Sequence, residues 1–383
     1  MNNPFQIIDS VKKIILDYYL EIIFLLNLFI FSISNSNLTF ILITKVVLVS
    51  FNILFSFYLI KHSSLKLNIN LIFVISFLVY SFLSIIYSAN QFYAFKKILF
   101  MLNIIPLGIM GFLIYSDNNN LDKFLKLMLI LFIPLIFISI FIQPFNATQS
   151  YSFSLLRWSH VLFSRFVGAA FILLLFSTLS QKYKTLLLSI LLFGLLYSGA
   201  RGPLVFIFFL LTYYFIRNYK NNNSIKIYFF IFFVITVFFF FFINFSNKRI
   251  LELLTINDFI KSGGVVVRIT LWDIAIKMFL DNYIFGAGLG GFETNFYSTL
   301  GAQLHYPHNI ILEVLSELGI IGFILFCIVF VLTLFKLKNY SIKIFILFLF
   351  SFYLALFSKD LSSNPFLFSF VFYYVDKESS GIG

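Results

Sequence analysis

The sequence predicts an all-α, polytopic integral membrane protein with about 11–12 transmembrane helices and one long outer loop, between the ninth and tenth helices. Composition supports this fold class: of the 383 residues, 61% are hydrophobic and 11% are charged. Soluble domains carry about 45–50% apolar and ~25% charged residues. Apolar runs recur along the whole chain, with no internal repeat and no linker between them. We therefore expect residues 1–383 to form a single membrane domain.

The apolar runs have the length of about 17–25 residues that a helix needs to cross a bilayer. Polar breaks separate them, and the runs at 183–200 and 202–217 follow each other so closely that they predict a helical hairpin. A shorter run at 364–375 is the candidate for a twelfth span. The longer runs lie near 14–34, 39–60, 70–88, 95–115, 125–143, 163–180, 183–200, 202–217, 226–244, 310–335 and 341–358.

The formal charge of +12 would suggest a nucleic-acid partner in a soluble protein. In a membrane protein, basic residues instead hold the cytoplasmic loops in place, so we expect membrane lipid and no nucleic acid as a partner. The bias of basic residues places the N-terminus inside, ahead of an uncleaved first span. On this topology Lys96 and Lys97 fall in an outer segment, and Lys45 lies within the second span.

Arginine is distributed differently from lysine. Five of the six arginines fall on the outer side: Arg157, Arg165, Arg201, Arg249 and Arg268. A planar guanidinium binds phosphate through two parallel hydrogen bonds and stays charged at every working pH. Arginine placed against the positive-inside trend therefore indicates an anion site at the outer face. The outer segments near 144–162 and 245–309 are long enough to hold such a site, whereas the other outer loops are short.

Arg201 joins two spans within the segment SGARGP at 198–203. Its small neighbours leave space for an anionic head group beside the guanidinium. From these residues alone, a hairpin turn whose arginine extends to the interface is the simpler interpretation.

Arg268 precedes Trp272 by four residues, so a helix puts both on one face. Apolar residues at Ile269, Trp272, Ile276 and Phe279 have the spacing of an amphipathic helix, which we expect to lie along the membrane surface. Arg268 would bind an anion, and Trp272 would orient that anion by stacking. The alternative is an interfacial anchor made of the same two residues.

His308 lies in the segment HYPHN at 305–309, immediately before the tenth span. Pro307 ends any preceding helix and suits the start of the next one. His308 would then sit at the positive end of a helix dipole, which favours the neutral imidazole that a general base needs. Asn309 would cap the helix or hold the ring. Two interfacial histidines, or a metal site shared with His305, are the alternatives, although no H-E-x-x-H motif or cysteine cluster supplies further ligands.

Glu313 and Glu317 follow on the tenth span, four residues apart and therefore on one face. Carboxylates within a membrane are costly and often functional, so we expect them to pair with an arginine or to line a substrate cavity. The chain has no D-x-D pair to hold a divalent metal, which favours a diphosphate neutralised by arginines. We therefore predict no metal and no cofactor.

Together these motifs resemble the O-antigen ligase and Wzy-type polymerase superfamily of bacterial envelope enzymes. The resemblance covers residues 183–335, including the outer loop 245–309. It is carried by SGARG at 198–202, RITLW at 268–272, GAGLGG at 286–291, PHN at 307–309 and EVLSELGIIG at 313–322. It implies a multi-pass protein of the bacterial cytoplasmic (inner) membrane with its active site on the outer, periplasmic face.

The resemblance also implies a glycosyltransferase that moves a glycan from undecaprenyl diphosphate to an acceptor sugar hydroxyl. His308 would be the catalytic base, and arginines would hold the diphosphate. The substrate-binding candidates are Arg201, Arg268, Arg165, Arg157, Trp272 and Glu313. The acceptor is another lipid-linked glycan in an O-antigen polymerase, the leading interpretation, or lipid A-core in a ligase. A lipid-linked glycan flippase is the rival from another class, and it would carry charged residues along its central spans.

Overall fold

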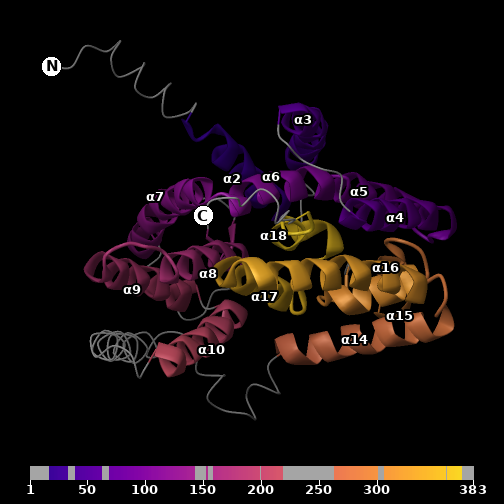
Figure 1. Ribbon diagram of the computed structural model, residues 1–383. Coiled ribbons are helices and arrows are strands. Elements are labelled where there is room, and N and C mark those ends of the chain that lie inside the picture. Colours follow the sequence, from indigo (N-terminus) through magenta and orange to yellow (C-terminus); the bar gives the residue numbers. More distant parts are fainter. Residues whose placement is uncertain are drawn as a thin grey trace.

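The computed structural model describes residues 17–32, 39–62, 69–142, 152–153, 158–198, 200–218, 263–300, 306–358 and 360–372. These residues form a bundle of packed helices (Figure 1). In chain order the elements are α2 (Tyr19–Ser32), α3 (Thr39–His62), α4 (Ile69–Leu83), η1 (Ser84–Tyr87), α5 (Gln91–Met101), α6 (Ile104–Ser116), α7 (Asn118–Ile142), β1 (Ser152–Phe153), β2 (Trp158–Ser159), α8 (His160–Leu175), α9 (Gln181–Ser198), α10 (Arg201–Asn218), α14 (Gly263–Asp281), α15 (Gly291–Leu300), α16 (Ile310–Tyr340), α17 (Ile342–Ala355), η2 (Leu361–Ser363) and α18 (Pro365–Phe368).

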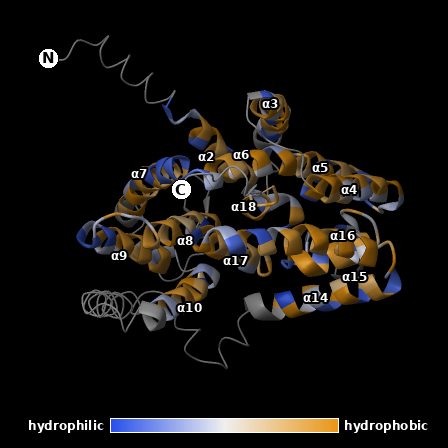
Figure 2. Cartoon of the chain, in the orientation of Figure 1, coloured by the Kyte–Doolittle hydropathy of each residue, from blue (hydrophilic) through white to orange (hydrophobic). Residues whose placement is uncertain are grey.

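The predicted all-α membrane fold is confirmed for the part of the chain that the structure describes. Four helices there are long and apolar enough to cross a membrane, and shorter apolar helices accompany them. Figure 2 shows hydrophobic residues along nearly every helix. The four long candidates are Ile43–Lys61, Ile69–Tyr87, Gln91–Ser116 and Ile310–Tyr340. The predicted ninth span at 226–244 lies outside the described residues, so the total of about 11–12 spans stays a prediction.

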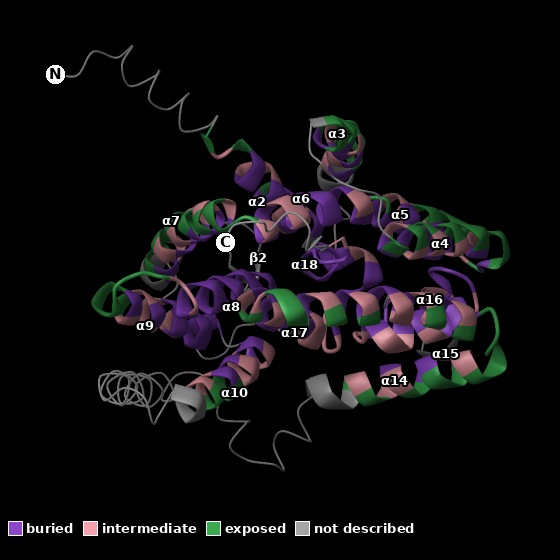
Figure 3. Cartoon of the chain, viewed as in Figure 1, coloured by how far each residue is buried: buried purple, intermediate pink, exposed green. Residues whose placement is uncertain are grey.

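Helix α8 lies at the centre of the bundle. Its side chains from Leu162 to Leu175 are buried all round the helix (Figure 3), and it packs against α7, α9, α10 and α17. A helix that is hydrophobic all round is expected in such a position. Gly168 lets α17 come close, because a Cβ there would lie only 2.5 Å from Cζ of Phe350.

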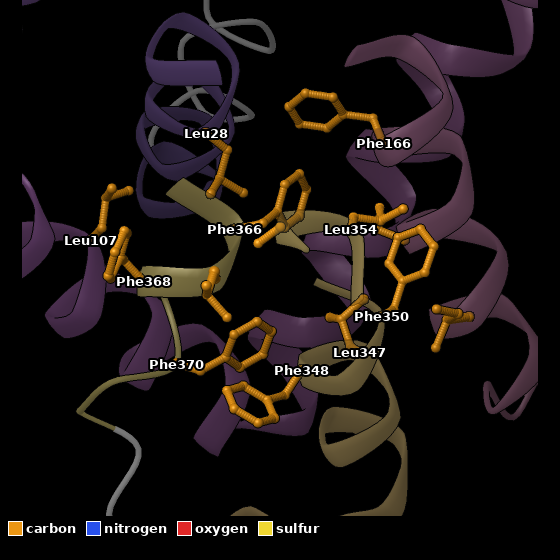
Figure 4. Packing of buried hydrophobic residues seen from close by; sticks show 14 of the residues in the cluster. Leu28, Leu107, Phe166, Leu347, Phe348, Phe350, Leu354, Phe366, Phe368 and Phe370 are labelled. Carbon is orange, nitrogen blue, oxygen red and sulfur yellow. The ribbon is translucent and has the colours of Figure 1, made fainter. Parts of the chain in front are cut away.

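The C-terminal segment corrects a prediction, because the run at 364–375 is no twelfth span in the described residues. Helix α18 has only four residues, and the aromatic side chains around it point into the bundle (Figure 4). The Phe366 ring lies 4.9 Å from the Phe166 ring of α8, and the Phe370 ring stacks on Tyr115 of α6 at 4.8 Å. A short apolar run can be a buried core segment as well as a span, and here it is buried.

The run at 95–115 lies within the candidate span Gln91–Ser116, as predicted, but its helix is interrupted. It forms two helices, α5 and α6, that are separated at Leu102 and Asn103. The Asn103 side chain accepts a hydrogen bond of 2.8 Å from Asn52 of α3, which also pairs with Asn27 of α2. These buried side-chain hydrogen bonds join α2 and α3 to the interruption between α5 and α6. Polar groups that lie away from water are expected to be paired in this way.

Helix α16 contains a break. Gly319 has φ 64° and ψ −165°, so the stretch 310–318 is a short helix distinct from the rest of α16. The turn between α14 and α15 fills this break. The N–H groups of Ala287 and Gly288 donate to the carbonyls of Ser316 and Glu317, at 3.0 and 2.9 Å. Backbone groups freed by a broken membrane helix must be satisfied by neighbouring protein, because lipid offers no partner.

Three glycines with positive φ make this close approach possible: Gly286, Gly288 and Gly290. A Cβ on Gly286 would lie 2.4 Å from the backbone of Glu317, and one on Gly288 would lie 2.6 Å from Cα of Ser88. The glycine-rich motif therefore lets one backbone pack against another.

Candidate functional site

Arg201 and Arg268, two of the candidates for phosphate binding, lie within electrostatic reach of each other. Arg201 is the first residue of α10, and Arg268 lies in the first half of α14. Burial lowers the pKa of Arg268, and the nearby positive charge of Arg201 lowers it further. Two guanidinium groups in electrostatic reach repel each other, so an anion bound between them would stabilise both. The fold therefore gathers the positive charge that a diphosphate site would need.

Trp272 lies one turn after Arg268 and is half-buried. Its ring packs against the apolar cluster between α14 and α15, beside Leu312 of α16. The indole Nε1 is buried without a hydrogen-bond partner among the described residues. Since buried indole N–H groups usually have a partner, this donor is suited to an oxygen-rich ligand. The stacking role predicted for Trp272 stays a prediction.

Helix α14 carries apolar residues on two sides. Ile269 and Ile276, on the predicted apolar face, are 57% and 46% exposed, as a face turned towards lipid would be. The other side of α14 packs against the protein, because α14 lies along α16. The buried side chains of α14 are Leu271, Ile274, Ala275 and Met278. The predicted position of α14 along the membrane surface stays a prediction.

His308 immediately precedes the cap of α16. The predicted cap is confirmed: the Asn309 side chain accepts hydrogen bonds from the N–H groups of Ile311 and Leu312, at 3.0 and 3.2 Å. His308 has φ 59°, a left-handed conformation that costs energy for a residue other than glycine. The edge of its ring meets Tyr306, with ring centroids 4.6 Å apart. His308 therefore lies immediately before the N-terminus of α16, and the neutral imidazole expected there stays a prediction.

Glu313 and Glu317 have an amine as their cationic partner instead of the arginine that we expected. The Lys97 ammonium forms an ion pair with Glu313 and another with Glu317, the second at 2.6 Å. Glu313 also accepts the N–H of Leu361 with both oxygens, at 3.0 and 2.9 Å. Glu313 is fully buried, and these contacts satisfy its carboxylate within the protein. Its substrate contact stays a prediction.

Sequence reasoning missed the role of Lys97. We placed Lys97 in an outer segment as a topology signal, but it lies inside α5 and is 2% exposed. The missed signal was the pair of carboxylates on the tenth span, since buried charges require a counter-charge. Nothing in the local pattern distinguishes Lys97 from its neighbour Lys96, because the pairing spans more than two hundred residues of chain.

The structure describes only one of the other two arginine candidates, Arg157 and Arg165. Arg157 lies outside the described residues. Arg165 is buried in α8, and its two terminal nitrogens donate to Asn364 and Ser358, at 2.8 Å and 2.7 Å. One of these nitrogens also bonds the carbonyl of Leu354. Arg165 therefore joins α8 to the C-terminal segment, and its contact with phosphate or glycan stays a prediction.

These features define a polytopic helical membrane protein in which Arg201 begins α10, Arg268 lies in the first half of α14 and His308 precedes the broken helix α16. Residues 185–327 match the model of the O-antigen ligase family, and the resemblance predicted from the sequence motifs is confirmed. No curated protein matches the chain. The family match leaves out Arg157 and Arg165 and takes in Arg201, Arg268, Trp272, His308 and Glu313.

Proposed function

We propose that this protein is a membrane glycosyltransferase that moves a glycan from undecaprenyl diphosphate to a sugar hydroxyl of the acceptor. The leading form of the proposal is a polymerase of O-antigen or another surface polysaccharide. The observation that carries it is that Arg201 and Arg268, on two different helices and within electrostatic reach of each other, both lie in the segment that matches the O-antigen ligase family. The protein would act in the bacterial inner membrane, with the site on the periplasmic face.

The donor would be held through its diphosphate. Arg201 and Arg268 come from two different helices, so their guanidinium groups could bind the two phosphates from separate sides. Arginine suits this task because its planar fork matches phosphate oxygens. Trp272, one turn from Arg268, would donate its buried N–H to the diphosphate or the first sugar.

His308 would act as the general base. The acceptor hydroxyl gives its proton to the imidazole while its oxygen attacks the anomeric carbon of the donor. The bond between that carbon and the diphosphate oxygen breaks, and undecaprenyl diphosphate leaves with its negative charge stabilised by the arginines. A neutral imidazole at a helix N-terminus is the form that can take the proton. This route uses no metal ion.

The acceptor decides between the two forms of the enzyme. In a polymerase it is a second lipid-linked glycan, whereas in a ligase it is lipid A-core. The shared motifs concern the shared donor and do not separate the two. Charged residues inside the spans, which a flippase would carry, are also present in the described helices, for example Lys45, Lys97 and Glu317. The glycosyltransferase is preferred because residues 185–327 match the O-antigen ligase family.

A deletion strain tests the proposal through its surface glycan. Single repeat units on lipid A-core would identify a lost polymerase, and free lipid-linked polymer would identify a lost ligase. Retention of single lipid-linked units on the cytoplasmic face would identify a flippase and contradict the proposal. The matched control is the same strain carrying the wild-type chain, which must restore the glycan.

A further inference from the structure

Six charged side chains meet inside the protein, and we call them the buried charge group. None is more than 5% exposed. They come from α3, α5, α8, α16 and the segment before η2. Three are cations and three are carboxylates, so the group is neutral as a whole. Its members are Lys45, Lys97, Arg165, Glu313, Glu317 and Asp360.

Lys97 and Asp360 lie at the centre of this group. Lys97 binds both carboxylates of α16. Asp360 accepts a hydrogen bond of 2.6 Å from the Ser362 hydroxyl and lies within electrostatic reach of Lys97 and Lys45. The next N–H along the chain, that of Leu361, donates to Glu313. Charges buried together hold a defined geometry, because each of them is unfavourable without its partner.

Both ion pairs of Lys97 fall on the same short piece of helix. Glu313 and Glu317 lie in the stretch 310–318, which Gly319 separates from the rest of α16. At its start this stretch carries the cap Asn309, whose carbonyl accepts the N–H of Glu313 at 2.9 Å. His308 comes immediately before that cap. The place of residue 308 therefore depends on the contacts that hold this short helix, and the ion pairs of Lys97 are among them.

We propose that Lys97 is a positioning residue for His308. Its ammonium fixes the stretch 310–318 against α5 and thereby holds the imidazole where it can reach the acceptor hydroxyl. The proposal rests on the proposed function for the role of His308, but the placement of residue 308 can be measured without any activity. A displacement of about 1 Å at a reacting group can lower the rate about 100-fold.

The main test compares Lys97→Met with Lys97→Arg in purified protein supplied with a lipid-linked repeat unit extracted from the deletion strain. Lys97→Met should lower kcat about 10-fold to 100-fold and leave KM within about threefold, because donor binding lies elsewhere. Lys97→Arg should recover most of the rate, since it keeps the charge. Lys96→Met is the matched control on the same helix, and it should behave like the wild type.

A second measurement follows residue 308 directly. Cys327 is the only cysteine in the sequence, so Cys327→Ser with His308→Cys gives one site for a nitroxide spin label. Adding Lys97→Met should make this label more mobile, and adding Lys96→Met should not. An unchanged label spectrum would overturn the positioning role. An unchanged kcat with a raised KM would overturn it as well.

The substitution Lys97→Met leaves two buried carboxylates uncompensated, and the protein could fail to fold. The combination of Lys97→Met, Glu313→Gln and Glu317→Gln removes the charges together and avoids that problem. A low kcat and a mobile label in this combination would support the proposal, whereas wild-type values of both would refute it. Full transfer by His308→Ala would instead refute the base assignment, and the label experiment would still decide the placement by Lys97.

Discussion

Gly319→Ala should destabilise the protein strongly, because Gly319 makes the break in α16. Its φ of 64° and ψ of −165° belong to a region that essentially only glycine occupies. A Cβ at this position would lie 2.4 Å from the carbonyl oxygen of Ile284 and 2.5 Å from the nitrogen of Gly286. Both are backbone atoms of the neighbouring turn, so no side chain can simply rotate away.

The magnitude follows from the strain and from the bonds that would be lost. A non-glycine residue in this region costs about 1–3 kcal/mol. Relieving the contact requires the glycine turn to withdraw, which breaks the bonds of Ala287 to Ser316 and of Gly288 to Glu317. Each backbone hydrogen bond is worth about 0.5–1.5 kcal/mol. We expect the free energy of unfolding to fall by about 3 kcal/mol or more.

The assay is thermal unfolding of the detergent-purified protein, followed by its loss from the monodisperse peak in size-exclusion chromatography. Gly319→Ala should lower the apparent melting temperature by about 5 °C or more. Gly291→Ala is the matched control at the end of the same turn. A Cβ there meets nothing closer than 3.4 Å, and alanine suits the start of α15. Equal melting temperatures for Gly319→Ala and the wild type would show that the break in α16 is not required.

Three further predictions concern the chemistry. His308→Ala should abolish glycan transfer while an immunoblot shows a normal protein level; polymer of near-normal length on a gel would contradict the base assignment. Arg201→Lys and Arg268→Lys should each lower transfer by about 10-fold or more, because charge alone does not give a forked hydrogen bond; full activity of both variants would count against phosphate binding. Transfer by purified protein should persist in EDTA, and a strict need for added Mg²⁺ would argue against neutralisation by arginines alone.

Local patterns predicted the features that depend on neighbouring residues. The apolar composition predicted the membrane fold, and the short break after 200 predicted the hairpin of α9 and α10. The position of Asn309 before an apolar run predicted the cap of α16. Each depends on helix length, turn chemistry or capping, which act within a few residues of the chain.

The sequence did not predict the features that depend on distant parts of the chain. The packed face of α14 is set by α16, and the counter-ion of Glu313 comes from α5. The segment 313–322 contains two glycines, yet only Gly319 has a positive φ, since the turn at 282–290 packs against that position. Without the partner, neither glycine is distinguished by its own neighbours.

The burial of Lys97 also strengthens the argument about arginine. The positive-inside rule counts basic residues in loops near the ends of spans. Lys97 was counted as an outer lysine, but it lies within the protein and is neutralised by Glu313 and Glu317. Removing it from the count makes the predicted inward bias of lysine larger, and the same correction takes the buried Arg165 out of the outer arginines. Arg201 and Arg268 remain as positive charges on the predicted outer side. The topology does not require positive charge there, whereas the binding of an anionic donor would require it.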